Sequence, residues 1–193
     1  MGKVIADISM SLDGFIAASH RTPEEPMGRG GEKLHEWAFG EDESSRELMA
    51  ESGAKLGALI AGRRTYDDSV RFWGADGPMG PARRPVFVVT HQAPADSPAD
   101  GVYTFVTDGI ESALEQARAA AGEQDVAVMG GADLIQRFLA AGLVDEIGIH
   151  LAPVLFGSGL RLFGDLGEGH VALEPIEVVD TRVAVHMRYR IRR

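Results

Sequence analysis

The 193-residue sequence contains no cysteine. It therefore cannot form a disulfide, supply a thiol nucleophile or bind a metal through thiolates, and this absence fits a cytoplasmic protein. Long apolar runs are also missing, since no segment approaches the ~18 residues that a membrane-spanning helix requires. The N-terminus lacks the basic, apolar and small-residue regions of a signal peptide. We expect a soluble cytoplasmic protein that has no membrane partner.

Basic residues are scarce as well. The chain has 19 Lys and Arg against 29 Asp and Glu, for a net charge of −10. A nucleic-acid-binding protein usually carries a basic face, whereas here the cations form only the short clusters at 62–65, 82–85 and 188–193. We therefore expect no nucleic-acid partner. An anionic ligand would have to be met by a few locally placed cations.

The histidines do not have the spacing of metal ligands. The His-Glu pair at residues 35–36 lacks a second histidine four positions on, and neither His91 nor His150 has a histidine close by in the sequence. We predict no metal site. The remaining composition, 45% hydrophobic and 25% charged, is that of a globular protein, and the length suits one domain over residues 1–193.

The common nucleotide-binding motifs are absent. The first strand-like segment runs into "SLDG" instead of the G-x-G-x-x-G that opens a Rossmann fold. The sequence also has no G-x-x-x-x-G-K-[ST] phosphate loop. Both of these nucleotide folds are therefore disfavoured, although a different nucleotide-binding fold stays open.

Apolar patterning predicts a chain in which strands alternate with helices. Strands are expected at 3–11, 57–62, 85–90, 102–106, 126–129 and 144–156, with helices at 32–56 (interrupted near Gly40), 63–74, 109–124 and 132–143. Residues 171–193 alternate around "DTR" and indicate a terminal hairpin. Alternation implies parallel βα units, and the last strands, with no helix between them, imply antiparallel pairing. We predict an α/β fold whose mixed, mostly parallel sheet is covered by helices on both faces.

Three strand–helix junctions carry residues suited to phosphate: Gly62-Arg63-Arg64-Thr65, Thr90-His91 and Gly130-Gly131-Ala132. In a parallel sheet all three lie at the carboxyl ends of strands, where ligands bind in open α/β folds. Glycine lets the backbone turn sharply and lets a ligand approach closely. The first amides of the following helix lack partners and favour an anion. The alternative for each junction is a tight turn with nothing bound.

The cations of the first junction are placed unfavourably for a bare helix. Arg63 and Arg64 open a helix, where the helix dipole repels positive charge. A bound anion relieves that conflict, and an arginine beside a 2′-phosphate favours NADP over NAD. Neighbours at a helix start point about 100° apart, so we expect one of the two arginines to face the cofactor. The alternative is a solvated helix start.

These segments occur in an order that resembles the dihydrofolate reductase superfamily: "SLDGFIA", "GRRTYD", "PVFVVTH", "VMGGADLI" and "APVLFGSGLRLF". The resemblance spans nearly the whole chain and is closer to the riboflavin-biosynthesis reductase branch (RibD C-terminal domain-like). It implies a three-layer α/β/α reductase that transfers hydride from NADPH to a small substrate, where the cofactor supplies the chemistry. The cofactor residues it implies are Ile16, Gly62, Arg63, Arg64, Thr65, Thr90, His91, Gly130, Gly131, Ala132, Asp133 and Leu134.

The candidate catalytic residues are Asp13 and Glu36. Asp13 lies in the loop that would border the substrate and could bind a hydroxyl or relay a proton, although Asp-Gly also favours a tight turn. The resemblance implies a substrate-binding carboxylate in the region that contains Glu32 and Glu36, and either residue could take that role. The alternative for Glu36 is a solvated helix face.

The candidate substrate-binding residues are Asp7, Trp37, Trp73 and Arg161. Asp7, within an apolar strand, either forms the pocket floor with a raised pKa or lies at a solvated strand edge. Trp37 either walls a planar ligand or packs helix on sheet, and Trp73 either lines the pocket or belongs to the core. Arg161 either binds a substrate anion or is a plain surface arginine.

We predict an NADPH-dependent reductase that acts on a small pterin-, pyrimidine- or ribosyl-like substrate. Two alternative functions stay open. One is a non-catalytic NADPH-binding sensor or scaffold, and the other is a weak folate or pterin reductase. A fused zinc deaminase is excluded because its ligands require cysteine. Members of the resembling branch often form dimers, and the alternation of "RVAVHMRYRI" makes a homodimer our expectation.

Overall fold

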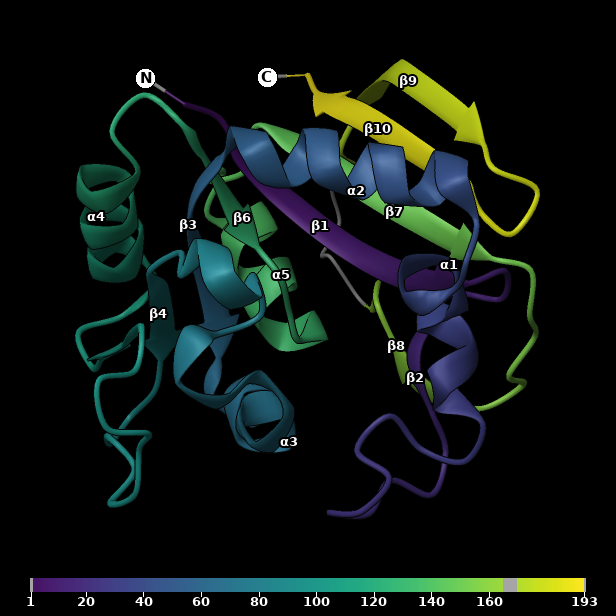
Figure 1. Cartoon of the computed structure of the whole chain (residues 1–193). Coiled ribbons are helices and arrows are strands. Elements are labelled where there is room, and N and C mark those ends of the chain that lie inside the picture. Colours follow the sequence, from purple (N-terminus) through teal and green to yellow (C-terminus); the bar gives the residue numbers. More distant parts are fainter. Residues whose placement is uncertain (1, 165–169, 193) are drawn as a thin grey trace.

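The computed structural model describes residues 2–164 and 170–192 and contains a sheet covered by helices on both faces (Figure 1). The strands are β1 (Val4–Ser11), β2 (Phe15–Ala18), β3 (Leu56–Gly62), β4 (Val86–Val89), β5 (Tyr103–Val106), β6 (Asp125–Val128), β7 (Glu146–Ala152), β8 (Gly159–Arg161), β9 (Leu173–Asp180) and β10 (Val185–Ile191). The helices are α1 (Glu36–Phe39), α2 (Glu43–Lys55), α3 (Arg63–Trp73), α4 (Ile110–Ala121) and α5 (Ala132–Ala140), with 3-10 turns η1 (Gly31–His35), η2 (Gly74–Asp76) and η3 (Gly80–Ala82).

The main sheet has eight described strands in the order β5-β4-β3-β6-β1-β7-β10-β9. Pairs from β5 to β7 are parallel, whereas β10 pairs antiparallel with both β7 and β9. The predicted mixed, mostly parallel sheet with a terminal antiparallel hairpin is therefore confirmed. Because β6 returns between β3 and β1, the carboxyl ends of these strands meet at the point where the strand order reverses, which is where ligands bind in such sheets.

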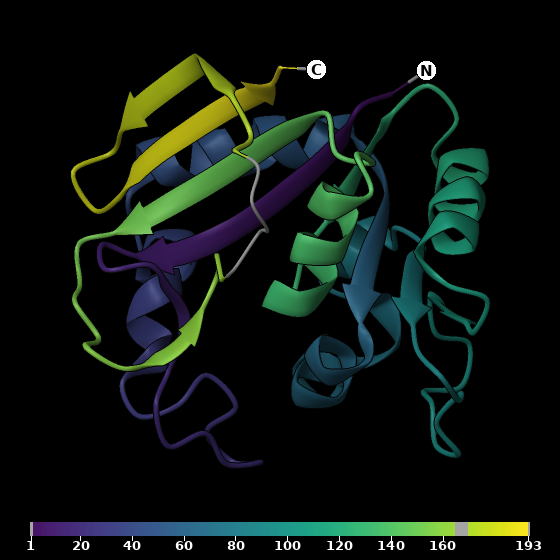
Figure 2. The same cartoon turned by 180° about the vertical axis from the view of Figure 1, so that it is seen from behind.

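One face of this sheet carries the main apolar core, beneath α4 and α5 (Figure 2). Val4 and Ala6 of β1 and Ile147 and Ile149 of β7 point toward it, together with the fully buried Phe138 of α5. These strand residues are two apart, as the side-chain period of a strand requires. The apolar alternation therefore explains why α4 and α5 dock on this face.

The opposite face has two halves. Over β3 and β4, α3 buries Tyr66 against Leu59 and Val88. Over β1, β7 and β10 lie η1, α1 and α2, and the strand residues that point toward them are largely polar. Within α2 only Ser45 is buried. This half is the less tightly packed one, and it holds the polar cluster described below.

The predicted helix at 32–56 is interrupted where the sequence indicated. α1 ends before Gly40, and α2 begins after Asp42, whose carboxylate accepts a hydrogen bond of 2.8 Å from the Ser45 amide. Such a side-chain cap is the usual start of a new helix. No helix in the described ranges has the length and apolarity needed to cross a membrane.

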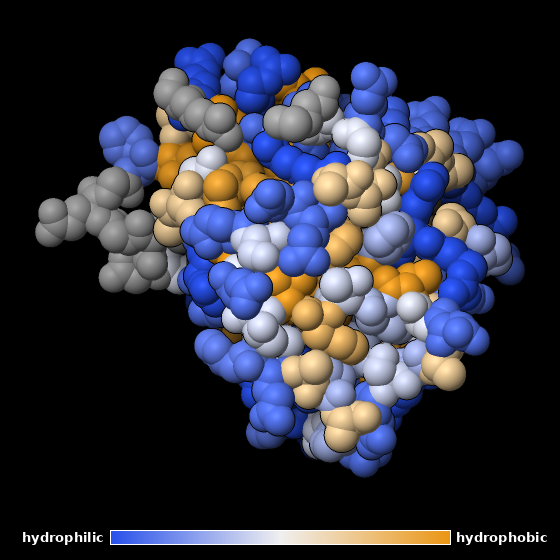
Figure 3. All heavy atoms as spheres, turned by 90° about the vertical axis from the view of Figure 1, so that its left-hand side faces the viewer, coloured by the Kyte–Doolittle hydropathy of each residue, from blue (hydrophilic) through white to orange (hydrophobic). Residues whose placement is uncertain are grey.

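A second, two-stranded sheet pairs β2 with β8 and was not predicted. Its strands are four and three residues long. Pairing of β2 with β8 places the loop after β1 beside residues 159–161. On the side that carries α4 and the β4–β5 edge, hydrophilic residues cover most of the visible surface, with hydrophobic residues in small groups between them (Figure 3).

Candidate active site

The three predicted junctions meet at one edge of the sheet. β3 lies between β4 and β6, so their carboxyl ends are neighbours. The amide of Gly62 donates a 2.8 Å hydrogen bond to the carbonyl of Gly130, which joins two of the junctions directly. Gly130 has a φ of 122°, a conformation that favours glycine. The Gly130–Gly131 peptide bond is cis.

The two glycines leave room for an approaching group. A Cβ built on Gly130 would lie 3.5 Å from Ile8 Cδ1 and 3.7 Å from Thr65 Oγ1, and one on Gly131 would lie 3.6 Å from the same hydroxyl oxygen. α5 follows at once and has no side-chain cap. Its first amides therefore have no partner within the helix. The junction thus offers amide donors and a threonine hydroxyl to an anion.

The structure separates the two arginines. The Arg63 guanidinium turns toward β4, where it donates to the Gln92 carbonyl at 2.7 Å and to Thr90 Oγ1 at 3.4 Å, and it also pairs with Asp67 at 2.8 Å. Arg64 is exposed and has no hydrogen bond or ion pair to any other described residue. Arg63 therefore joins the junctions of β3 and β4. That one arginine faces a cofactor stays a prediction.

Arg64 lines a separate groove of about 540 Å³ between α3 and the loop after β2. The other lining residues are Arg21, Thr22, Pro23, Pro26, Asp67, Asp68 and Arg71. Arg21 pairs with Asp68, and Arg71 donates to the Glu24 carbonyl at 2.9 Å. The loop after β2 therefore forms one side of this groove.

The remaining cofactor candidates differ in accessibility. Thr90 is 9% exposed, and His91 is exposed beside it. Ala132 and Leu134 face the core from the first turn of α5, whereas Asp133 is exposed. Ile16 belongs to the core as part of β2. The first turn of α5 can therefore bind a ligand mainly through its backbone amides, because Ala132 and Leu134 point into the core.

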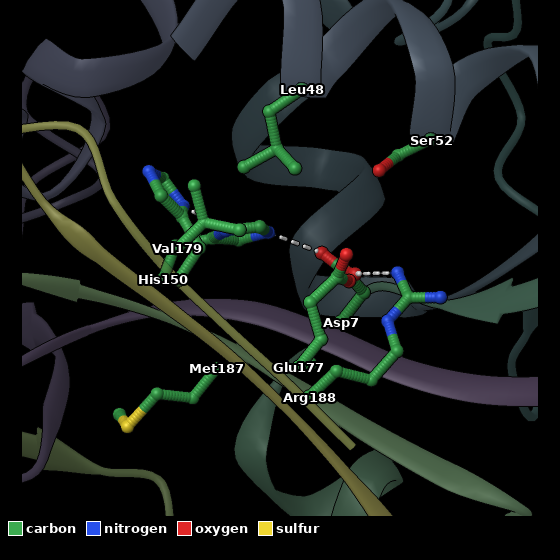
Figure 4. A pocket seen from close by; sticks show the side chains of 10 residues that line it. Asp7, Leu48, Ser52, His150, Glu177, Val179, Met187 and Arg188 are labelled. Atoms are coloured by element: carbon green, nitrogen blue, oxygen red, sulfur yellow. Dashed lines mark hydrogen bonds and ion pairs between the residues drawn. The ribbon is translucent and has the colours of Figure 1, made fainter. Parts of the chain in front are cut away.

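On the polar half of the opposite face, four side chains form one hydrogen-bonded chain, of which Figure 4 labels Asp7 and His150. Asp7 Oδ1 lies 2.8 Å from His150 Nε2, and His150 Nδ1 lies 2.7 Å from His186 Nδ1. His186 Nε2 in turn lies 3.1 Å from the Thr181 hydroxyl. The chain crosses from β1 to β7 to β10 and ends in the turn before β10. We call these residues the Asp7–Thr181 chain.

Strand register brings these residues together. β1 pairs with β7 so that Asp7 is opposite Gly148 and Ser9 opposite His150, and β10 places His186 opposite His150. A Cβ on Gly148 would lie 2.6 Å from Asp7 Oδ2. Gly148 does not have a positive φ, so its backbone conformation does not require glycine. Its missing side chain instead makes room for the Asp7 carboxylate.

The pKa of Asp7 is lowered, contrary to the raised pKa expected from the sequence. Burial alone would raise the pKa of this carboxyl, but the charge and hydrogen bond of His150, with the charges of Arg188 and His186, outweigh burial and lower it. Arg188 Nη2 lies 3.9 Å from Asp7 Oδ2. Asp7 lines a small cavity of about 20 Å³ with His150 and His186, so of the two placements left open, the structure favours the pocket floor.

Two neighbouring histidines are held in their neutral form. Burial, reinforced by the charge of His150, lowers the pKa of His186 to about 4, although Asp7 and Asp42 act in the opposite direction. Burial and His150 also lower the pKa of His35. With an ionised Asp7, the cluster therefore contains a carboxylate beside neutral imidazoles at neutral pH.

Trp37 packs against this cluster from α1. It is 7% exposed, its indole N–H donates to Ser9 Oγ at 3.0 Å, and its ring stacks on His150 at 4.2 Å between centroids. His186 meets the same ring edge-on at 4.7 Å. Trp37 therefore packs helix on sheet, one of the two predicted alternatives, and at the same time covers the Asp7–Thr181 chain.

The two predicted catalytic carboxylates lie outside the cluster. Asp13 accepts hydrogen bonds from the Ser11 hydroxyl and from the amides of Gly157 and Phe156, and these donors lower its pKa to about 2. A carboxylate that stays ionised at neutral pH does not store a proton, so Asp13 clamps two loops instead. Glu36 is exposed at the start of α1 and pairs with Lys33 at 2.8 Å, which matches its alternative of a solvated helix face.

Arg161 and Trp73 also lie away from the cluster. Arg161 donates to the Asp13 carbonyl at 3.1 Å and lies over the Phe15 ring at 4.4 Å, so it holds β8 against the turn after β1. Trp73 ends α3 and is half-buried; the next residue, Gly74, accepts a hydrogen bond from Tyr103 of β5. Several strands separate β5 from β1.

Comparison with known proteins identifies the family. A sequence model described as the RibD C-terminal domain matches residues 2–185. The chain belongs to the RibD C-terminal domain family. A relative from Bacillus subtilis (strain 168), uncharacterized protein YyaP, is 24% identical over 173 residues, covering 85% of this chain and 81% of that protein.

Solved structures agree with this family. A putative riboflavin biosynthesis protein from Shewanella sp. PV-4 has a TM-score of 0.75 at 25% identity and covers 99% of both chains. A dihydrofolate reductase from Enterococcus faecalis, complexed with NADP(H) and RAB-propyl, has a TM-score of 0.58 at 16% identity, covering 100% of this chain and 98% of that one. The dihydrofolate reductase-like fold predicted from the sequence motifs is therefore confirmed.

Sequence reasoning missed most of the Asp7–Thr181 chain in this family member. His150 was considered only as a metal ligand, and His186 and Thr181 were not considered. The available signal was strand period: in "EIGIHLA", Glu146, Gly148 and His150 alternate with apolar residues and therefore share a face. Among the described residues, no group of three or more His, Cys, Asp or Glu side chains could hold a metal ion.

Proposed function

We propose that this chain is an NADPH-dependent reductase of a small pterin-, pyrimidine- or ribosyl-like substrate. The observation that carries the proposal is the meeting of three phosphate-suited junctions at the sheet edge, joined by the Gly62–Gly130 hydrogen bond and by Arg63 bonded to Thr90 and Gln92. Family membership and the NADP(H) named in the Enterococcus reductase complex support it. Bound NADPH would supply a hydride.

The residues at the junctions fit the phosphates of that cofactor. The free amides at the start of α5 and the space above Gly131 suit a pyrophosphate. Arg63 has its Nη2 donors left for a 2′-phosphate, because Nε bonds to Asp67 and Nη1 bonds to Gln92 and Thr90. It lies at the start of α3, whose first turn contains no acidic residue. These two features together favour NADPH over NADH, because only NADPH carries the 2′-phosphate.

Calorimetric titration with NADPH and NADH tests the proposal. We expect micromolar affinity for NADPH, a loss of about 100-fold or more in Gly131→Val because its branches fill the space above the junction, and a loss of about 10- to 100-fold in Arg63→Ala. Arg64→Ala is the matched control, since Arg64 points into the separate groove, and we expect less than about a threefold change. The Arg63→Ala loss should be confined to NADPH.

Failure of the wild-type chain to bind either nucleotide would overturn the proposal. Binding of NADPH with no reductase activity would instead favour the alternative of a sensor or scaffold.

We also propose that two copies of the chain form a homodimer through the β9–β10 end of the sheet. β9 is an edge strand, and Leu173, Ile176 and Val178 are exposed on it, Val178 by 64%. An exposed edge with apolar side chains invites pairing with another strand. Light scattering after size exclusion should report a dimer, and Val178→Lys should shift it toward the monomer. A wild-type monomer would contradict the proposal.

A further inference from the structure

Most of the hydrogen-bond donors of Arg63 are already bonded within the protein. An arginine has five N–H donors in one rigid plane. The Nε–H of Arg63 donates to both Asp67 carboxylate oxygens, at 2.8 and 2.9 Å, and Nη1 donates to the Gln92 carbonyl at 2.7 Å and to Thr90 Oγ1 at 3.4 Å. Over residues 2–164 and 170–192, Nη2 bonds to no other group. A phosphate that reaches Arg63 therefore finds only the donors of Nη2.

The positive charge of Arg63 is also matched within the protein. Asp67 lies about one turn further along α3, and its carboxylate forms an ion pair with the Arg63 guanidinium. The two side chains are 35% and 48% exposed, so water screens their charges only in part. An anion at Nη2 would share one guanidinium with this carboxylate, and like charges at such short range repel one another. Arg63 and Asp67 together thus offer donors without a net positive charge.

The other basic side chains around the start of α3 do not contact Asp67. Arg64 lines the separate groove and bonds to no other residue that the structure describes. Arg21, in the same groove, is paired with Asp68. The attraction that remains for an anion at this junction comes from Arg63 Nη2 and from the positive end of the α3 dipole.

We propose that Asp67 is a specificity-determining residue that limits the preference of this junction for a 2′-phosphate and thereby keeps the site open to NADH. This inference rests on the proposed function. The two cofactors differ only at the 2′ position of the adenosine ribose, where NADPH carries a phosphate and NADH a hydroxyl. The Asp67 carboxylate repels the phosphate, whereas the hydroxyl has no charge to be repelled. Arg63 therefore favours NADPH, and Asp67 reduces the size of that preference.

A purely positioning role for Asp67 predicts the opposite sign. If the carboxylate acts only by holding the guanidinium plane in place, its replacement loosens Arg63 and weakens NADPH binding. The Gln92 carbonyl and the Thr90 hydroxyl hold Nη1 independently of Asp67, so the plane keeps these two contacts when Asp67 is changed. We therefore expect the loss of repulsion to outweigh the loss of order.

Calorimetric titration of Asp67→Asn with NADPH and NADH measures the preference directly. Asparagine keeps the shape of the side chain and one acceptor oxygen, and it removes the charge. We expect the variant to bind NADPH about three- to tenfold more tightly than the wild type, and its NADH affinity to change by less than about twofold. Unchanged or weaker NADPH binding in this variant overturns the proposal.

Asp68→Asn is the matched control, because it makes the same charge change at the next residue. The Asp68 carboxylate pairs with Arg21 and not with Arg63, so the NADPH affinity should change by less than about twofold. Equal tightening in both variants would be an effect of net charge and would overturn the assignment to Asp67. In the Arg63→Ala background, Asp67→Asn should still tighten NADPH binding, since the repulsion does not act through Arg63. No effect in that background counts against the proposal and indicates a positioning role.

The fragment 2′-AMP separates this inference from the reductase proposal, because it carries the phosphate without the nicotinamide. In NMR titrations of the 15N-labelled protein, Asp67→Asn should tighten 2′-AMP binding by about three- to tenfold and change 5′-AMP binding by less than about twofold. If the wild-type chain binds neither dinucleotide, the reductase proposal fails, while a tighter 2′-AMP complex in Asp67→Asn still supports the role of Asp67. Absence of 2′-AMP binding, or equal 2′-AMP affinities in the variant and the wild type, overturns that role.

Discussion

The two faces of the sheet differ most clearly along β7. Ile147 and Ile149 point to the core beneath α5, whereas Glu146 and His150, the alternate residues of the same strand, point to the opposite side beneath α1 and α2. Glu146 is 1% exposed and His186 is 4% exposed, so polar groups of this face are buried. Burying such groups is costly unless they are hydrogen-bonded or paired.

The two faces of the sheet therefore contribute differently to the stability of the fold. The face beneath α4 and α5 buries apolar side chains, which is the main favourable term in folding. The face beneath α1 and α2 is occupied by Asp7, His150 and His186, and its small cavity has no counterpart in a close-packed core. We infer that the first face contributes most of the hydrophobic stabilisation of the fold.

The largest effect is expected from the apolar face. Phe138 of α5 is fully buried in the main core. Phe138→Ala leaves a cavity there, and the free energy of unfolding should fall by about 3–5 kcal/mol. Urea denaturation followed by circular dichroism measures this loss. A loss below about 1 kcal/mol would mean that α5 does not anchor the fold.

Acid should destabilise the protein through the polar face. His186 has a pKa of about 4 in the folded protein, below the unfolded value of 6.5. The unfolded state therefore binds more protons between these values, and stability falls as the pH falls through this range, by about 2–3 kcal/mol. Asp7 acts later: its lowered pKa adds stability above its unfolded value of 3.8, and this contribution is lost below that pH.

His186→Gln checks the acid prediction, because glutamine keeps hydrogen-bonding groups and does not titrate. Unfolding free energies measured at several pH values between 6.5 and 4 should show a flatter slope in this variant than in the wild type. His20→Asn is the control: His20 is exposed and has a φ of 58°, which asparagine tolerates. An equal slope in all three proteins would contradict the assigned pKa.

The contact between α1 and the polar face should contribute less. Trp37→Phe removes the indole N–H that bonds to Ser9 and reduces the stacking on His150. We expect a loss of about 1–3 kcal/mol in the free energy of unfolding, together with altered histidine NMR signals. Trp73→Phe, at the half-buried end of α3, should leave the histidine signals unchanged. If both variants behave alike, Trp37 has no special relation to the cluster.

The sequence predicts one region of the molecule well because its signals are local. Gly62 to Thr65 and Gly130 to Ala132 are short motifs at strand ends, and the strand–helix alternation alone places them at one edge of a parallel sheet. Their meeting in the structure follows from this rule. β2 and β8 escaped prediction because each is too short to show a period, and their pairing depends on contacts between distant segments.

The polar cluster could not be predicted in the same way. Asp7, His150 and His186 are far apart in the sequence, and only the register of β1, β7 and β10 brings them together. The pKa of Asp7 shows the difficulty most clearly. From the sequence, burial is the only visible influence and raises it; in the structure, His150 and Arg188 are close enough to reverse the shift.

The smallest effect is expected where α2 covers the polar face. Leu48 is half-buried and lines the small cavity, so Leu48→Ala removes few contacts, and we expect a loss below about 1 kcal/mol. Leu114 of α4 is 6% exposed in the main core, and the same change there should cost about 2–4 kcal/mol. Urea denaturation of the two variants compares two helices with one substitution. Equal losses would mean that α2 is as tightly packed as α4.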